Sequence, residues 1–413
     1  MSRRYGRPTW RAGAMLHMQC GRSSVTWRGP GAMADPVRIL VLANLPPWVM
    51  GGAEHQTARL VEQWCLMGAH VEVAGFRIPD GVVRLGDAEV KTYRLRSISG
   101  LGRTARGGTY LASLLVFARR HRKRFDVAYC RGLADAALGL SLARGLGLWR
   151  APILAVPINA HGQGDASFVR SVPLSPQWRS LMNRQLGAIN LINSAINGEL
   201  DALGLYEPRR SFIPNGIEIR PQIVRTHVGR PRRLMWTGRF EHQKGLDLLV
   251  DALRCMHEIE GRCTIDLYGD GPLRQHIADL VVSNGLGGVV RFGGVLGKDE
   301  VRDRLTDSDA FVLPSRYEGM SNSALEAMEA GLPVLCTSCG GIDQTVQEGA
   351  GWVCAANDPE DLRRTLRRML SETDDAWLEM GSKARLLVEQ RFRIEDIAAR
   401  NLELLHDLAR VGA

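Results

Sequence analysis

Short, continuous apolar runs alternate with longer amphipathic stretches along most of the chain. Residues 37–43 (VRILVLA) form the first apolar run, and an amphipathic stretch over residues 53–67 follows a loop that carries proline and glycine. Residues 70–76 form the next apolar run. Because continuous apolar runs are typical of strands buried on both faces of a parallel sheet, this order predicts a βαβ unit.

The same alternation continues along the chain and predicts two series of βα units. The strands of the first series are expected at residues 37–43, 70–76, 126–130, 152–156 and 188–193, and those of the second at residues 233–237, 263–268, 289–292, 310–313, 333–336 and 352–355. A break near residues 212–231 separates them. We therefore predict an α/β protein with two Rossmann-like, doubly wound parallel sheets. Open α/β sheets bind ligands beyond the carboxyl ends of their strands, so we expect a ligand in an interdomain cleft.

The length of 413 residues agrees with two domains of ordinary size. We place the first, Rossmann-like domain at residues 35–212 and the second at residues 213–393, followed by a terminal helical segment at residues 394–413. Residues 1–34 are set apart as a basic leader, which we expect to be disordered.

Net charge adds little once the leader is considered separately. The formal charge is +9, and residues 1–34 supply six arginines and no acid, so the remainder is only mildly basic and does not point to nucleic acid. The leader lacks the apolar run of a secretory signal. A transit-like segment, a basic tail and a misassigned start are the alternatives, and we favour translation from Met33.

No stretch approaches the roughly 18 consecutive apolar residues that a membrane-spanning helix needs. The eight cysteines are irregularly spaced, which indicates buried free thiols in a reducing compartment. Cys336 and Cys339 form a C-x-x-C pair, but no second pair completes a zinc site, so we interpret both as packing residues. The expected location is cytoplasmic.

The most informative segment covers residues 310–337. It predicts a strand, a polar loop at residues 314–321, a helix at residues 322–330 and a second strand, with Glu318 and Glu326 on either side of the loop and first helical turn. A helix amino terminus offers free N–H groups and a positive dipole end, while carboxylates accept hydroxyl hydrogen bonds. This combination suits an anionic, polyhydroxylated ligand such as a nucleotide-sugar. The alternative is that both glutamates only favour the helix dipole.

Two glycine-bearing loops follow predicted strands. Gly51 and Gly52 end the first βα loop, where a phosphate could approach the backbone closely, although a tight turn before a helix is the preferred explanation of this motif taken alone. Arg239 and Lys244 follow the first strand of the second series, and an arginine fork with a lysine charge could clamp a diphosphate. Two solvated surface cations are the alternative.

Three further features of the sequence have both a functional and a structural interpretation. Asp307 and Asp309 match a D-x-D metal motif but precede a strand, at the edge opposite the ligand, so we predict a turn and no metal. His161 follows a strand in a glycine-bearing loop and is equally compatible with a structural and a functional role. The basic run at residues 119–124 ends a predicted helix (residues 110–120); a solvated helix end is the default, and contact with anionic membrane is the alternative.

Five motifs together carry a family resemblance: GGAE at 51–54, PNGIE at 214–218, GR…KG at 238–245, YGDGP at 268–272 and EGMSNSALEAMEAG at 318–331. Their order and spacing resemble the retaining glycosyltransferases of family 4 (glycosyl transferases group 1). The resemblance extends from Val37 to about Leu408 and is stronger in the second domain. It implies a GT-B fold, an acceptor-binding first domain and a terminal helix that crosses back to the first domain.

The resemblance also assigns roles to individual residues. It implies that Arg239 and Lys244 hold the donor diphosphate, with Gly51 and Gly52 opposite them, and that Glu326 binds the ribose. It further implies a donor-sugar site with the carboxylate of Glu318, amides from Gly319, Met320, Ser321 and Asn322, an acceptor-side histidine at His161, and base contacts near Phe292 and Gly293. One departure is visible, because Asp343-Gln344 stands where members commonly have Pro-Glu.

The activity implied by the resemblance is transfer of a hexose, with retention, from a UDP- or GDP-sugar to an acceptor hydroxyl. We expect no metal or cofactor, because cations take the role of a metal. A saccharide or lipid-linked acceptor would place the protein in polysaccharide or glycolipid biosynthesis, peripherally at the inner face of the membrane. A nucleotide-sugar epimerase and a catalytically silent GT-B scaffold are the alternatives.

Overall fold

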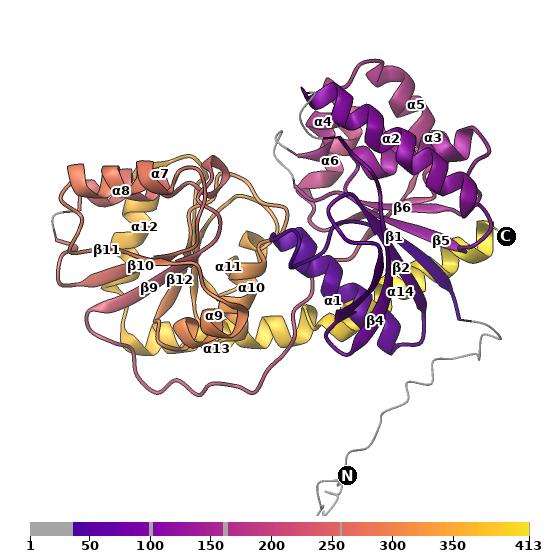
Figure 1. Ribbon diagram of the computed structural model, residues 1–413. Helices are drawn as coiled ribbons and strands as arrows, with labels where there is room; N and C mark the ends of the chain where they lie inside the picture. The colour runs from indigo at the N-terminus through magenta and orange to yellow at the C-terminus, as the bar shows by residue number, and fades with distance from the viewer. Residues whose placement is uncertain (1–35, 99–101, 160–163, 257, 413) are drawn as a thin grey trace, which may run out of the picture. The chain divides into compact units, whose positions relative to one another are not determined.

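The structure is a computed structural model that describes residues 36–98, 102–159, 164–256 and 258–412. Its two sheets confirm the predicted α/β class (Figure 1). Every predicted strand forms, with bounds that differ by at most two residues.

The first sheet has eight strands in the order β3-β4-β2-β1-β5-β6-β7-β8, and only the β3–β4 pair is antiparallel. Its strands are β1 (Arg38–Leu42), β2 (His70–Gly75), β3 (Gly81–Leu85), β4 (Ala88–Arg94), β5 (Val127–Arg131), β6 (Ile153–Val156), β7 (Ala188–Leu191) and β8 (Arg209–Phe212). The β3–β4 hairpin and edge strand β8 were not predicted. They alternate in burial or are largely exposed, so they lack the continuous apolar run used to find the others.

Helices cover both faces of this sheet (Figure 1). One face carries α2 (Gly102–Arg120), α3 (Asp135–Gly145), α4 (Asp165–Ser171), α5 (Ser175–Gln185) and α6 (Ala195–Leu203), and the other carries α1 (Gly52–Leu66) and the terminal helix α14 (Ile394–Gly412). The Trp64 indole on α1 donates a hydrogen bond of 3.0 Å to the Ala398 carbonyl, which fixes α14 to the first sheet.

The second sheet is entirely parallel, in the order β11-β10-β9-β12-β13-β14. Its strands are β9 (Arg232–Thr237), β10 (Cys263–Tyr268), β11 (Val290–Gly294), β12 (Ala310–Leu313), β13 (Val334–Thr337) and β14 (Gly351–Cys354). Figure 1 shows helices on both faces: α7 (Leu246–Arg254), α8 (Arg274–Ser283) and α12 (Pro359–Ser371) on one, and α9 (Lys298–Thr306), α10 (Asn322–Glu329) and α13 (Asp374–Arg391) on the other. A short helix, α11 (Asp343–Gln347), connects β13 to β14.

Strand order locates the ligand-binding edge of each sheet. In the first sheet, β2 lies on one side of β1 and β5 lies on the other. In the second sheet, β10 lies on one side of β9 and β12 lies on the other. Such switch points open a crevice at the strands' carboxyl ends. The buried apolar residues form two clusters, and the larger one joins the first sheet to the α10-covered face of the second. Within the described residues, no helix has the length and apolarity needed to cross a membrane.

Candidate functional site

The loops that follow β9 and β10 pack backbone against backbone. Phe240 N–H donates to the Asp270 carbonyl at 3.0 Å, and a Cβ on Gly269 would overlap the Gly238 carbonyl oxygen. Gly269 also has φ of +131°, so glycine is required on both steric and conformational grounds. This close approach shapes the loop that carries Arg239 and Lys244.

Lys244 and Glu318 meet at the switch point of the second sheet. Lys244 ends the 3-10 turn η1 (His242–Lys244), and its ammonium lies 2.6 Å from Glu318 Oε1. The side chains are 19% and 6% exposed, and the Ser315 hydroxyl donates a second hydrogen bond of 2.7 Å to the same carboxylate oxygen. The loop is held close to β12 because a Cβ on Gly245 would overlap the Pro314 carbonyl. Lys244 thus forms a charge-assisted hydrogen bond to a buried carboxylate at the carboxyl edge of this sheet.

Arg239 does not join this pair. Its side chain is 62% exposed, and its guanidinium pairs with Glu241 at 2.8 Å. The two cations that the sequence suggested as one clamp therefore have separate partners in this structure.

The side chains of three asparagines hold the loop from Glu318 to Asn322 in place. Ser321 caps α10 by accepting the Ala324 N–H, and the helix begins at Asn322, as the sequence predicted. The Asn322 amide donates to the Gly52 carbonyl at 2.7 Å, and Asn215 donates to the Asn322 side chain at 3.1 Å.

Two of these asparagines come from outside the second sheet. Asn193, after β7, donates to the Gly319 carbonyl, and Asn215 also donates to the Met320 carbonyl at 3.3 Å. Sequence reasoning gave neither residue a role. The only signal for Asn215 was its place in the PNGIE motif.

Glu326 has a partner that the sequence did not indicate. The Arg59 guanidinium on α1 lies 2.8 Å from Glu326 Oε1, so α1 and α10 are joined by an ion pair. His55, one turn earlier on α1, has its pKa lowered below 6.5, chiefly by burial and then by Arg59. Glu326 and Arg59 line a small cavity with Lys298, and this cavity does not include Arg239, Lys244 or Glu318.

The glycines of the first βα loop lie against α10. Gly52 begins α1, and a Cβ added there would contact the Asn322 amide at 3.4 Å. Gly51 precedes the helix in extended conformation, and its Cβ would overlap the Glu54 carboxylate. These contacts bring the GGAE motif next to the EGMSN loop.

The segment expected near the base lies beside the β9 and β10 loops. The Phe292 ring stacks on Phe240 with centroids 6.1 Å apart, and the Arg274 guanidinium lies over the same ring at 5.7 Å. A Cβ on Gly293 would overlap the Tyr268 ring. A partly exposed aromatic and a cation could therefore receive a planar base.

Three other positions named from the sequence are His161, the D-x-D segment and the GGIDQ segment. His161 lies outside the described residues. Asp309 accepts the Gly229 and Arg233 N–H groups at 2.9 and 2.7 Å, which fixes the start of the second sheet. In the GGIDQ segment, a Cβ on Gly341 would lie 2.5 Å from the Gly319 carbonyl oxygen, so this loop still packs against the EGMSN loop.

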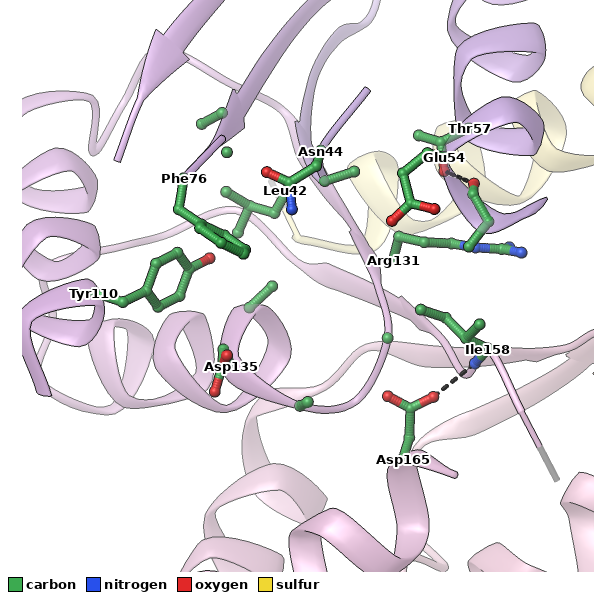
Figure 2. Close-up of a pocket in the computed structure, with 17 residues that line it drawn as sticks. Leu42, Asn44, Glu54, Thr57, Phe76, Tyr110, Arg131, Asp135, Ile158 and Asp165 are labelled. Atoms are coloured by element: carbon green, nitrogen blue, oxygen red, sulfur yellow. Dashed lines mark hydrogen bonds between the residues drawn. The ribbon is translucent and has the colours of Figure 1, made fainter. Parts of the chain in front are cut away.

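A larger recess lies at the carboxyl edge of the first sheet, at the β1/β5 switch point (Figure 2). It contains about 670 Å³ of empty space, part of it open to solvent. Its polar lining includes Glu54, Arg131, Asp135 and Asp165, and its aromatic lining is Phe76 and Tyr110. Asp165 is satisfied by the Ile158 and Leu133 N–H groups at 2.6 and 2.9 Å.

Comparison with known proteins adds three findings. Residues 231–372 match the family model of glycosyl transferases group 1. Glycogen synthase from Mycobacterium tuberculosis is 30% identical over 217 residues, which cover 51% of this chain and 51% of that protein. The chain thus spans about half the length of this curated relative.

Solved structures share the fold over most of the chain. Sucrose-phosphate synthase from Thermosynechococcus elongatus has a TM-score of 0.75 at 19% identity, covering 91% of this chain and 100% of that one. Anabaena HepE in complex with UDP-glucose has a TM-score of 0.68 at 18% identity, covering 90% of this chain and 99% of that one. The fold is therefore GT-B, as the resemblance implied.

Proposed function

Residues 231–372 belong to the glycosyl transferases group 1 family, and on this premise we propose that the protein transfers a hexose from a UDP- or GDP-sugar to an acceptor hydroxyl. The observation that carries the proposal is the Lys244–Glu318 pair, held beside the capped amino terminus of α10 at the switch point of the second sheet. A cation, free helix N–H groups and a carboxylate together suit a ligand that joins phosphate to sugar. The UDP-glucose in the HepE structure supports this donor class.

Donor binding then exchanges partners. Lys244 then binds the diphosphate while it keeps its ion pair with Glu318. Arg239 leaves Glu241 and also binds the diphosphate, because the exposed Arg239–Glu241 pair contributes little stability. The ribose hydroxyls bind Glu326, and the sugar hydroxyls bind Glu318 and the amides of the EGMSN loop.

The chemical step is proposed to retain the anomeric configuration. The bond from the sugar anomeric carbon to the diphosphate oxygen breaks, and the acceptor oxygen bonds to the same face of that carbon. The acceptor proton passes to the leaving phosphate. Cations at the diphosphate stabilise the negative charge that grows there, which is the role that a metal would otherwise have.

We also propose a cytoplasmic location, with peripheral contact to the inner face of an anionic membrane. Helix α2 contains no acidic residue, and five cations at and beyond its end are exposed. Arg124 pairs with Glu72, and the other four are Arg119, Arg120, Arg122 and Lys123. Each such cation near an anionic surface adds about 1 kcal/mol of binding. A lipid-linked acceptor in polysaccharide or glycolipid biosynthesis would fit this surface. Glutamine at all four positions should abolish sedimentation with phosphatidylglycerol vesicles, and unchanged sedimentation would contradict the contact.

The main test uses UDP- and GDP-hexoses, with EDTA present, followed by mass spectrometry and NMR of the anomeric proton. We expect one donor to be consumed, with a product of retained configuration, and Lys244→Met to lower the rate about a hundred- to a thousandfold. An epimerised nucleotide-sugar formed without acceptor would instead identify an epimerase. No binding of UDP or GDP in calorimetry would identify a scaffold.

A further inference from the structure

The recess of the first sheet has an aromatic wall and three polar side chains that make no hydrogen bond to another described residue. Phe76 and Tyr110 meet edge to face, with ring centroids 6.0 Å apart. Tyr110 is only 7% exposed, and Figure 2 shows its hydroxyl pointing into the recess. Within the described part of the chain this hydroxyl has no hydrogen-bond partner, which leaves it able to bond to an occupant of the recess.

Two carboxylates also line the recess, and of these Glu54 is partly buried and Asp135 is exposed. Glu54 on α1 and Asp135 at the start of α3 line the recess, and neither makes a hydrogen bond or ion pair to another described residue. Arg131 is the one cation in the described lining, and its guanidinium is directed at Tyr129 and Asn215, at 3.5 and 3.4 Å. The described lining therefore holds three carboxylates, those of Glu54, Asp135 and Asp165, against the single guanidinium of Arg131, whose Nε has no hydrogen-bond partner.

The recess adjoins the proposed donor site at two points. Ile158 lines the recess, and its carbonyl oxygen lies where a Cβ on Gly319 would be. Arg131 is connected through Asn215 to Asn322 at the start of α10. An occupant of the recess would therefore lie next to the loop that is proposed to hold the donor sugar.

The charge of the lining selects the occupant. A diphosphate or a uronate would be repelled by Glu54 and Asp135, whereas sugar hydroxyls or an ammonium group would donate to them. The carbon–hydrogen face of a sugar ring would pack against Phe76 and Tyr110, which supply the apolar wall.

The family resemblance implies that the first domain binds the acceptor; we propose that the acceptor unit held in this recess is a neutral sugar or amino sugar without an anionic substituent. The inference rests on the proposed glycosyltransferase function, since it assigns the second substrate of that reaction. Glu54 and Asp135 accept its hydrogen bonds, and the Tyr110 hydroxyl bonds to it.

The test compares p-nitrophenyl glycosides that differ in charge: glucoside, glucosaminide, glucuronide and glucoside 6-phosphate. Donor hydrolysis, transfer and ligand-observed NMR binding in the presence of UDP are measured in parallel. We expect binding and transfer with the first two, and at least tenfold weaker binding of the two anionic compounds. Donor hydrolysis without acceptor is the separate check of the proposed function.

Substitutions of the lining carboxylates test whether these side chains cause the preference for neutral glycosides. Asp135→Asn and Glu54→Gln should each lower the ratio of transfer to donor hydrolysis about tenfold to a hundredfold, the value of a hydrogen bond to a charged group. Both substitutions should also reduce the difference in binding affinity between the glucoside and the glucuronide. Asp375→Asn is the matched control, because Asp375 is likewise a first-turn acid but lies on α13, outside the recess lining.

Two outcomes would overturn the inference while leaving the proposed function intact. In the first, the glucuronide or the glucoside 6-phosphate binds with the same affinity as the neutral glucoside. In the second, no glycoside binds at millimolar concentration although the donor is hydrolysed. Absence of both donor hydrolysis and UDP binding would instead refute the proposed function and this inference with it.

Discussion

Replacing Lys244 by methionine should destabilise the second domain, because it leaves Glu318 buried without its cation. The ammonium lies 2.6 Å from a carboxylate that is 6% exposed. Methionine keeps most of the side-chain volume, so the change removes charge rather than packing. Among the described residues, the Ser315 hydroxyl, at 2.7 Å, is then the remaining side-chain partner of the carboxylate.

The expected magnitude follows from this geometry. Removing one partner of a buried ion pair costs about 3–5 kcal/mol, and the retained hydroxyl hydrogen bond places this case at the lower end, at about 3 kcal/mol. For a domain of this size, that corresponds to a fall in midpoint temperature of about 6–12 °C. The double variant Lys244→Met/Glu318→Gln should recover about 1–3 kcal/mol, because a neutral amide no longer needs the cation.

Differential scanning calorimetry at neutral pH measures these changes. Lys298→Met is the matched control, since Lys298 and its partner Glu218 are 55% and 51% exposed and 3.2 Å apart. It should cost less than about 1 kcal/mol. A loss below about 1 kcal/mol in Lys244→Met, or a double variant as unstable as the sum of the two single ones, would refute the reasoning.

Three other predictions test the site and its surroundings. Glu318→Gln releases Lys244 from its buried partner, so UDP affinity in calorimetry should rise while transfer falls; an unchanged affinity would argue against Lys244 as a phosphate ligand. Gly319→Ala places a methyl group against the Ile158 carbonyl, so the free energy of unfolding should fall by about 1–3 kcal/mol in thermal unfolding. Gly198→Ala on α6 has open space around the new methyl group and should not lower the free energy of unfolding. The pKa of His55 is lowered in the folded state, mainly by burial, so the unfolded chain binds more protons below its usual value. The free energy of unfolding should therefore decrease as pH falls below about 6.5, and His55→Gln should flatten that slope in urea titrations at several pH values.

Local sequence pattern was sufficient for much of the architecture. Continuous apolar runs located the buried parallel strands, because such strands are covered on both faces. The sequence also placed Lys244 and Glu318 after strands of the same sheet, and they meet across 74 residues because these strands, β9 and β12, are neighbours that end at the same edge. Neither inference required knowledge of side-chain orientation.

The remaining contacts were decided by the tertiary structure. Arg59 pairs with Glu326, and Asn193 and Asn215 hold the loop before α10, although no local pattern distinguishes them from other polar residues. Arg239 follows the expected strand yet pairs with Glu241 at the surface. A sequence fixes which face of a strand or helix a residue occupies, because periodicity is local. Which partner a long polar side chain finds depends on the packing of elements far apart in the chain, and that information exists only once the sheets and helices are assembled.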